Sequence, residues 1–534
     1  MLTLQSPKSH PVFLMIVVTT IILFTASSVR HALFHSTAYD LAIFDQAIYL
    51  ISKNQTPFSS LMGINILGDH TAFIFYPLAL LYKIYPDVHW LLFVQAFALA
   101  LGAWPSWSLA RQAGLNEPRA ILCEGFANAL AAVYLLYPVV FNVNLFDFHP
   151  EVIALPAILA AILAARLNKT LWFCAAILLI LSCKAVLSLT VLMMGVWLFF
   201  FEKNRKCGLI AIFLGAAWFL IATQAIVPYF NQGKQHAGVG RYQYLGNSVL
   251  EIAINLIFKP HLVASRIFST DTLGYLILLF LPVIWWISPR QLSPLISALP
   301  MLFMNILSDI DAQRDLIHQY SVPIFPFLLT AVISTVADRQ KRGKNFWKNA
   351  RSYLWNHRHL MPRIWKPVSQ RLSIKSVKHI WMRHLSIRRS WRWGKLLFAN
   401  LSKLLILWSL LSFLILAKYG YFGTIYLESL DTWQATRQAI NLVQTQGNVL
   451  TDNSLATHLA HRQTIKLLHQ VANGQSLNEF EYVLLNMRHP WHDTADTAVS
   501  VVAKLKKSPE FKISYQQDDV FLFQKVSPKI GSNE

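Results

Sequence analysis

Charged residues are scarce in this sequence of 534 residues: they make up 14% of the chain, whereas hydrophobic residues make up 55%. A soluble protein of ordinary composition carries about 25% charged residues. Apolar runs long enough to cross a bilayer recur along most of the chain. The composition therefore excludes a soluble enzyme with a single membrane anchor and indicates a multi-pass integral membrane protein.

Cysteine is also scarce, because the whole chain contains only Cys123, Cys174, Cys183 and Cys207. These residues lie inside or at the ends of apolar runs, and their spacing is not that of a metal site. We interpret them as small packing residues and expect no disulfide framework.

The apolar runs predict a bundle of about eleven transmembrane helices. The first run, after Lys8, lacks a convincing cleavage site and is interpreted as a retained helix rather than a signal peptide. A short run from Thr71 to Tyr82 contains Pro77 and is expected to be interfacial or re-entrant. The expected spans lie at roughly 11–26, 88–110, 119–141, 151–167, 170–183, 185–201, 208–229, 272–288, 292–307, 318–336 and 398–418.

The basic residues of the short loops fix the expected orientation. With the N-terminus in the cytoplasm, Arg111, Arg166, Lys203 and Arg290 all fall on the inner side, as the positive-inside rule requires. An odd number of spans then places the C-terminal tail outside. The same count places four polar segments outside, at 31–70, 142–151, 231–271 and 309–319.

The net charge of +21 comes mainly from one stretch, because 17 Lys and Arg lie between residues 339 and 395. We expect residues 338–397 to form a cytoplasmic loop whose Trp and basic residues bind anionic lipid as amphipathic helices. A disordered loop that only sets topology is the alternative. Nucleic-acid binding is not expected, because both ends of the loop are tethered to the membrane.

The composition becomes soluble after the last apolar run. Residues 432–444 and 493–507 are typical of amphipathic helices, and 448–451, 464–468 and 482–486 of short strands. Residues 511–515 and 520–524 alternate around a turn, which predicts a hairpin. The tail from 419 to 534 is therefore expected to be a small extracytoplasmic α/β domain.

Acidic residues follow the first helix, on the expected outer side. Asp40 and Asp45 are surrounded by apolar residues, and a carboxylate beside hydrocarbon is costly unless it is paired or used. Both are candidate functional residues; a helix N-cap for Asp40 and a solvated position for Asp45 are the structural alternatives. His70 follows Asp69 and is a candidate ligand, proton carrier or headgroup-level polar residue.

The outer turn at 144–151 alternates Asp147, His149 and Glu151. An extended turn would put these three side chains on one side, where they could bind a divalent cation such as Mg²⁺ or Mn²⁺. The alternative is a polar turn in which Pro150 opens a helix and the helix dipole favours Glu151.

Several cations also lie at the expected outer face. Lys184 interrupts a long apolar stretch, which suggests either a functional role or a snorkelling side chain. Cations outside work against the positive-inside tendency, so they are candidates for binding an anion such as a phosphate. Solvated loops are the alternative. The remaining candidates in these outer loops are Lys234, Arg241, Arg314 and His318.

Six short motifs, taken together, resemble an uncharacterised bacterial membrane protein family, domain-of-unknown-function family twenty-seventy-nine. They occur in the family's order over nearly the whole chain, although Lys184 is followed by Ala185 and Val186 where the family usually has acids. The motifs are Asp40-Leu-Ala-Ile-Phe-Asp-Gln46, Phe58-Ser-Ser60, Gly68-Asp-His70, Asp147-Phe-His-Pro-Glu151, Gln319-Tyr-Ser-Val-Pro323 and Asp452-Asn-Ser-Leu-Ala-Thr-His-Leu-Ala-His-Arg462.

The resemblance implies a fold like that of the GT-C glycosyltransferases, in the bacterial cytoplasmic membrane. Those enzymes take a sugar from a polyprenyl-phosphate donor and use an acid of the first outer loop, where Asp40 and Asp45 lie. The implied organisation is a membrane core at 1–337, the basic loop at 338–397, a last helix at 398–418 and the outer domain at 419–534. The alternatives are a transporter or flippase of an anionic or lipid-linked substrate, and a non-catalytic envelope protein.

Overall fold

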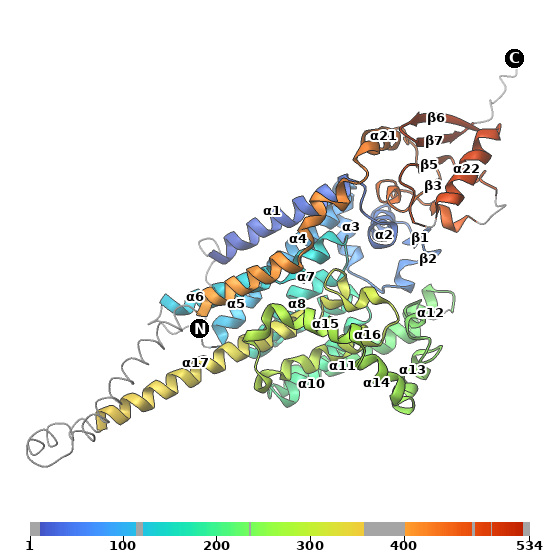
Figure 1. Ribbon diagram of the computed structural model, residues 1–534. Helices are drawn as coiled ribbons and strands as arrows, with labels where there is room; N and C mark the ends of the chain where they lie inside the picture. The colour runs from blue at the N-terminus through green and yellow to red at the C-terminus, as the bar shows by residue number, and fades with distance from the viewer. Residues whose placement is uncertain are drawn as a thin grey trace, which may run out of the picture.

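The helices lie side by side in an elongated bundle, with a small α/β domain at one end (Figure 1). The computed structural model describes residues 11–113, 121–233, 237–356, 401–471, 476–492 and 494–526. The fold class expected from the sequence is confirmed: a mainly helical membrane-type bundle is followed by a C-terminal mixed sheet.

The helices follow the apolar runs, because a backbone in lipid must satisfy its hydrogen bonds within its own segment. The first half of the chain contains α1 (Pro11–Ala32), α2 (Ile43–Ser52), α3 (Phe75–Ile84), α4 (His89–Leu101), α5 (Ala103–Gln112), α6 (Ile121–Leu135), α7 (Pro138–Leu145), α8 (Glu151–Arg166), α9 (Thr170–Cys183), α10 (Leu187–Phe200), α11 (Arg205–Ile221) and α12 (Val227–Phe230), and the short strands β1 (Phe58–Ser59) and β2 (Ile64–Asn65). The second half of the bundle contains α13 (Val249–Phe258), α14 (Pro260–Ile267), α15 (Thr270–Phe280), α16 (Leu299–Leu307) and α17 (Phe325–Asn356).

Four described helical segments are long and apolar enough to cross a membrane: Pro11–Ala32, His89–Gln112, Gly125–Leu145 and Arg205–Phe230. Two bent pairs, at 260–286 and 401–427, raise this number to as many as six. Five shorter apolar helices are also described, and one of them is α3, the segment expected to be interfacial. The full count of about eleven spans stays a prediction.

Helix α17 extends from the bundle core past residue 338, where the sequence places the start of the basic loop (Figure 1). The first part of that expected loop is thus a continuation of a core helix, up to Asn356. The rest of it, from 357 to 397, lies outside the described residues, so lipid binding by this loop stays a prediction.

The C-terminal domain has the elements that the sequence predicts. Its sheet has the order β4-β3-β5-β7-β6, in which β3 is parallel to β4 and β5, while β7 is antiparallel to β5 and β6. The elements are α21 (Leu430–Asn441), β3 (Val449–Thr451), β4 (Ile465–Leu467), β5 (Tyr482–Asn486), α22 (Ala495–Lys507), β6 (Phe511–Gln517) and β7 (Val520–Lys525).

The two faces of this sheet have different partners, because successive side chains of a strand point to opposite sides. One face packs against α22, with Val483 and Phe523 in that core. The other face shares a core with α21 and with the α2–α3 unit that lies against the bundle, where Leu484 and Phe44 belong to the same cluster. The C-terminal domain therefore rests directly on the segment that carries Asp40 and Asp45.

Candidate functional site

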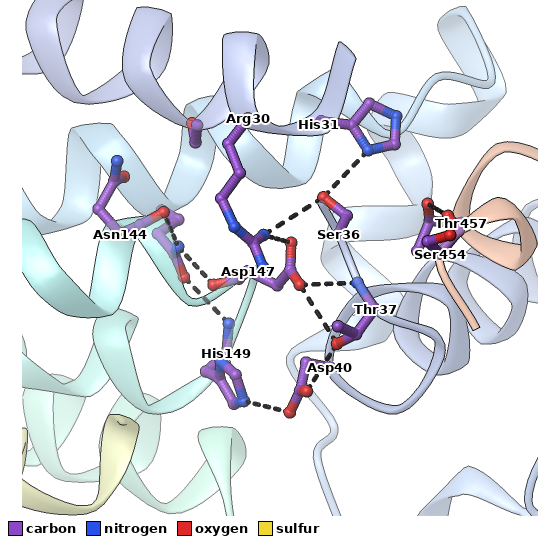
Figure 2. A network of polar contacts seen from close by, with 12 residues as sticks. Arg30, His31, Ser36, Thr37, Asp40, Asn144, Asp147, His149, Ser454 and Thr457 are labelled. Carbon is purple, nitrogen blue, oxygen red and sulfur yellow. Dashed lines mark hydrogen bonds and ion pairs between the residues drawn. The ribbon is translucent and has the colours of Figure 1, made fainter. Parts of the chain in front are cut away.

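Asp40 lies in a widened helical turn, Ala38–Ala42, which joins α1 to α2. Its Oδ2 accepts a hydrogen bond from the Thr37 hydroxyl at 2.7 Å, and its Oδ1 lies 3.4 Å from His149 Nε2 (Figure 2). Burial alone would raise the pKa of Asp40, but the hydrogen bond and charge of His149 and the hydrogen bond from Thr37 lower the pKa below its usual value. These partners favour the charged form of Asp40, which lies in the first turn of Ala38–Ala42 and does not cap a helix.

The turn between α7 and α8 carries His149 and is fixed by Gln95 of α4. The Gln95 amide nitrogen donates to the Asp147 carbonyl at 2.6 Å, and its amide oxygen accepts from the His149 N–H at 3.0 Å. Asp147 has a φ of 69°, a left-handed conformation that a short polar side chain tolerates better than most. This clamp turns the His149 ring toward Asp40.

A buried ion pair joins the end of α1 to the same turn. Arg30 binds the Asp147 carboxylate, whose second oxygen accepts from the Thr37 N–H at 2.9 Å (Figure 2). The Asp147 side chain is 1% exposed and the Arg30 side chain 8%. A buried charge is stable only when it is paired and hydrogen-bonded, and Asp147 meets both conditions through Arg30 and the Thr37 N–H. The bond to Thr37 holds the start of the turn that carries Asp40.

The expected cation ligands Asp147, His149 and Glu151 do not converge. Asp147 binds Arg30 and Thr37, His149 faces Asp40, and Glu151 binds Lys184. Within the described parts of the chain, no group of three acidic, histidine or cysteine side chains is arranged to hold a metal ion. The predicted Mg²⁺ or Mn²⁺ set is therefore not assembled, because each of its side chains already has a separate partner.

His70 and the Lys184–Glu151 pair lie beside this cluster. Lys184 separates α9 from α10, and the N–H of the next residue donates to the His70 carbonyl at 3.3 Å. The Phe44 ring lies 4.8 Å from the His70 ring and 6.1 Å from the His149 ring, between centroids. His70 Nδ1 is 2.6 Å from Asp69, so His70 adjoins the cluster without facing Asp40 directly.

Asp45 is turned toward the C-terminal domain. It accepts hydrogen bonds from the Tyr82 hydroxyl at 2.6 Å and from His461 Nε2 at 3.0 Å, and the His461 ring stacks on Tyr49 at 4.6 Å. Burial alone would lower the pKa of His461, but the charge and hydrogen bond of Asp45 raise this pKa above its ordinary value. The structure thus separates the two acids of the first outer segment.

Aromatic rings continue the cluster from His149 toward a second outer loop. The Phe146 ring stacks on His149 at 5.4 Å and meets the His318 ring at 4.1 Å. His318 is 6.4 Å from the Tyr320 ring, over which the Arg241 guanidinium lies at 5.3 Å. These contacts form a row of side chains that begins with an acid and ends with a cation. Its members, in order, are Asp40, His149, Phe146, His318, Tyr320 and Arg241.

The two remaining candidate cations differ in their placement. Arg314 is buried and binds the Ser308 carbonyl and Asp311, so it stabilises its own loop. Lys234 lies outside the described residues. His318 Nδ1 is held 2.6 Å from Asp315.

The sequence did not reveal several residues that build this site, among them Gln95 and Arg30. The tail motif at 452–462 also contributes, because Asn453 accepts a hydrogen bond from the Ala38 N–H at 2.7 Å and His461 binds Asp45. The motifs at 40–46 and 452–462 are both visible in the sequence, which could have suggested a contact between them. Their separation along the chain, however, does not indicate how close they lie in space.

The comparisons agree with this architecture. The family described as "Predicted membrane protein (DUF2079)" matches residues 30–361 and 372–522. No curated protein matches the chain. ArnT from Cupriavidus metallidurans bound to undecaprenyl phosphate is similar in structure, with a TM-score of 0.51 and 12% identity over 97% of this chain and 98% of that one. Its apo structure gives a TM-score of 0.52 and 13% identity over 98% and 99%. The likeness, at this identity, shows a shared fold, in agreement with the fold that the family resemblance implies.

Proposed function

The chain belongs to the DUF2079 family of predicted membrane proteins, and on this premise we propose that it is a membrane glycosyltransferase. It would transfer a sugar from a polyprenyl-phosphate donor to an acceptor hydroxyl at the outer face. The bound undecaprenyl phosphate of the structurally similar ArnT supports this class of donor.

The observation that carries the proposal is the position of Asp40 among its neighbours. Arg30 neutralises Asp147 and Lys184 neutralises Glu151, whereas Asp40 makes no ion pair with a described Lys or Arg. Its side chain is 25% exposed, against 1% for Asp147 and 5% for Glu151. Asp40 is thus a partly exposed carboxylate whose partners favour its charged form, as a general base requires.

The proposed reaction is a single displacement. The acceptor oxygen forms a bond to the anomeric carbon of the sugar while the bond from that carbon to the phosphate oxygen breaks. The acceptor proton passes to Asp40, and the electron pair of the broken bond leaves with the polyprenyl phosphate. Attack from the face opposite the leaving group inverts the configuration at the anomeric carbon.

Arg241 and His318 are the proposed phosphate ligands. Arg241 makes no ion pair with a described acid, and its guanidinium can bind a phosphate through paired hydrogen bonds. A cation there would stabilise the charge that develops on the leaving group. Phe146 lies between His149 and His318, and Tyr320 lies between His318 and Arg241, where aromatic faces could contact a sugar ring.

The other candidate residues receive supporting roles in this proposal. Asp45, already bound by Tyr82 and His461, would hold the C-terminal domain against α2. Lys184 would balance the buried charge of Glu151, and His70 would support the segment packed against it. No step of the proposed reaction uses a divalent cation.

The test uses purified protein in proteoliposomes with a panel of undecaprenyl-phosphate sugars and a lipid extract as acceptor. Release of undecaprenyl phosphate, measured by mass spectrometry, reports transfer. Asp40→Asn should abolish release, whereas the control Asp271→Asn, an exposed acid in the first turn of α15, should not.

The same assay separates the rival functions. Movement of a labelled lipid across the bilayer without release of undecaprenyl phosphate would identify a flippase and overturn the proposal. A protein that neither releases nor moves any lipid of the panel, yet binds a partner through its C-terminal domain, would be a non-catalytic envelope protein.

A further inference from the structure

A basic cavity lies at the end of the bundle away from the C-terminal domain. It has a volume of about 900 Å³ and is bounded by the ends of α5, α8 and α10, the start of α11 and the middle of α17. The residues around Asp40 lie at the other end of these helices, so this cavity is separate from the proposed reaction site. It takes no part in the proposed function.

The charge of the cavity lining is strongly unbalanced. Its acids, Glu202 and Asp338, are both already paired: Arg166 binds Glu202 at 2.7 and 3.2 Å, and Arg342 binds Asp338 at 3.0 Å. Four further cations of the lining make no ion pair with a described acid. They are Lys203, Arg205, Lys206 and Lys341.

The local backbone positions two of these cations, Lys203 and Arg205, at the cavity rim. Asn204 donates to the Ala165 carbonyl at 2.7 Å and caps α11 by accepting from the Cys207 N–H at 3.2 Å. Lys203 has a left-handed φ of 56°, which is uncommon for a residue other than glycine. The backbone of Lys203 and Arg205 is thus held on either side of Asn204, so both side chains start from the same rim of the cavity.

We propose that this cavity binds a phosphate group, carried by an anionic lipid headgroup or by a soluble phosphate compound. Like charges that converge on one cavity repel each other, and a bound anion removes that repulsion. Ammonium and guanidinium groups are the usual ligands of phosphate in proteins. The positive-inside rule explains cations at this end of the bundle but does not require them to line a common cavity.

The first experimental arm tests the lipid source. Wild-type protein is released from nanodiscs of equal phosphatidylcholine and phosphatidylglycerol, and retained lipid is identified by native mass spectrometry. Wild type should retain phosphatidylglycerol, and K203Q/K206Q/K341Q should lose about tenfold or more of that preference. The matched control K169Q/R290Q/K403Q removes three exposed cations of the same end that do not line the cavity, and should behave as wild type.

The second arm tests the soluble source. In nanodiscs of phosphatidylcholine alone, inorganic pyrophosphate should raise the unfolding temperature of wild type and of the control, but not of the cavity variant. A response in either arm that is lost only in the cavity variant supports the proposal and identifies the source. Equal behaviour of the cavity and control variants in both arms, or no response of wild type in either, overturns it.

Two further variants keep the test decisive if the triple variant does not fold. K206Q changes one exposed residue and should weaken binding with little effect on folding. A337F leaves every charge in place but fills part of the cavity, because Ala337 is buried in its wall. Unchanged binding in both variants would also overturn the proposal.

Discussion

His149 Nε2 lies 3.4 Å from Asp40 Oδ1, which links the first outer segment to the turn between α7 and α8. This contact brings together residues from two distant motifs of the sequence. It also orients the carboxylate that the proposed reaction uses as its base.

The first prediction concerns Asp40. Asp40→Asn should lower the rate of sugar transfer by about 100-fold to 10,000-fold, because an amide cannot accept the acceptor proton. Donor binding should change little, so the loss should appear in kcat rather than KM. The assay is release of undecaprenyl phosphate under saturating donor. A variant with more than a third of wild-type kcat would exclude Asp40 as the base.

Asp45 should behave differently from Asp40. Asp45→Asn removes the charge that His461 and Tyr82 bind, so it should loosen the contact between α2 and the C-terminal domain. Hydrogen exchange in α2 and in residues 455–462 should rise, while transfer should fall by less than about tenfold. Loss of transfer as complete as in Asp40→Asn, with unchanged exchange, would assign the base role to Asp45 instead.

Arg30→Met should be strongly destabilising, because it leaves the buried Asp147 carboxylate without its cation. Breaking one partner of a buried pair costs about 3–5 kcal/mol. The double variant R30M/D147L should recover part of this loss, since no unpaired charge remains. Thermal unfolding in one detergent compares the three proteins; equal melting temperatures for wild type and Arg30→Met would contradict the prediction.

Stability should depend on pH through His458. Burial lowers the pKa of His458 to about 4, from the ordinary value of 6.5. At a pH between these two pKa values, His458 binds a proton in the unfolded state but not in the folded state. The free energy of unfolding therefore falls as pH decreases from about 6.5 to about 4. His458→Phe keeps a ring beside His31 and Phe34 and should lack this contribution. The check is urea unfolding of both proteins across this range; parallel curves would contradict it.

The fold could be predicted in considerable detail because its signals are local. Apolar runs such as that of α1 indicate helices directly, and the alternation in β6 and β7 indicates a hairpin. The C-terminal strands were all expected within a residue or two of their observed ends. The contact of this domain with α2 was not predictable, because nothing local indicates which face of a sheet meets another element.

The site was predictable by residue type but not by pairing. Asp40, Asp147 and His149 were found because polar residues at the outer ends of apolar runs are costly without a role. Their partners come from elsewhere: Arg30 ends what looks like an ordinary membrane helix, and His461 lies in the C-terminal domain. The alternation of Asp147, His149 and Glu151 suggests shared ligands, whereas in the structure each of these side chains contacts a different partner.

The most direct measurement of the central claim is a cryo-EM structure of the wild-type protein in nanodiscs with undecaprenyl phosphate added. We predict phosphate density within hydrogen-bond distance of Arg241 or His318, with a sugar-sized space between it and the Asp40 carboxylate. The prenyl chain should leave this site toward the membrane. Absence of phosphate density near Arg241 and His318, or phosphate bound there with the C-terminal domain between it and Asp40, would contradict the account.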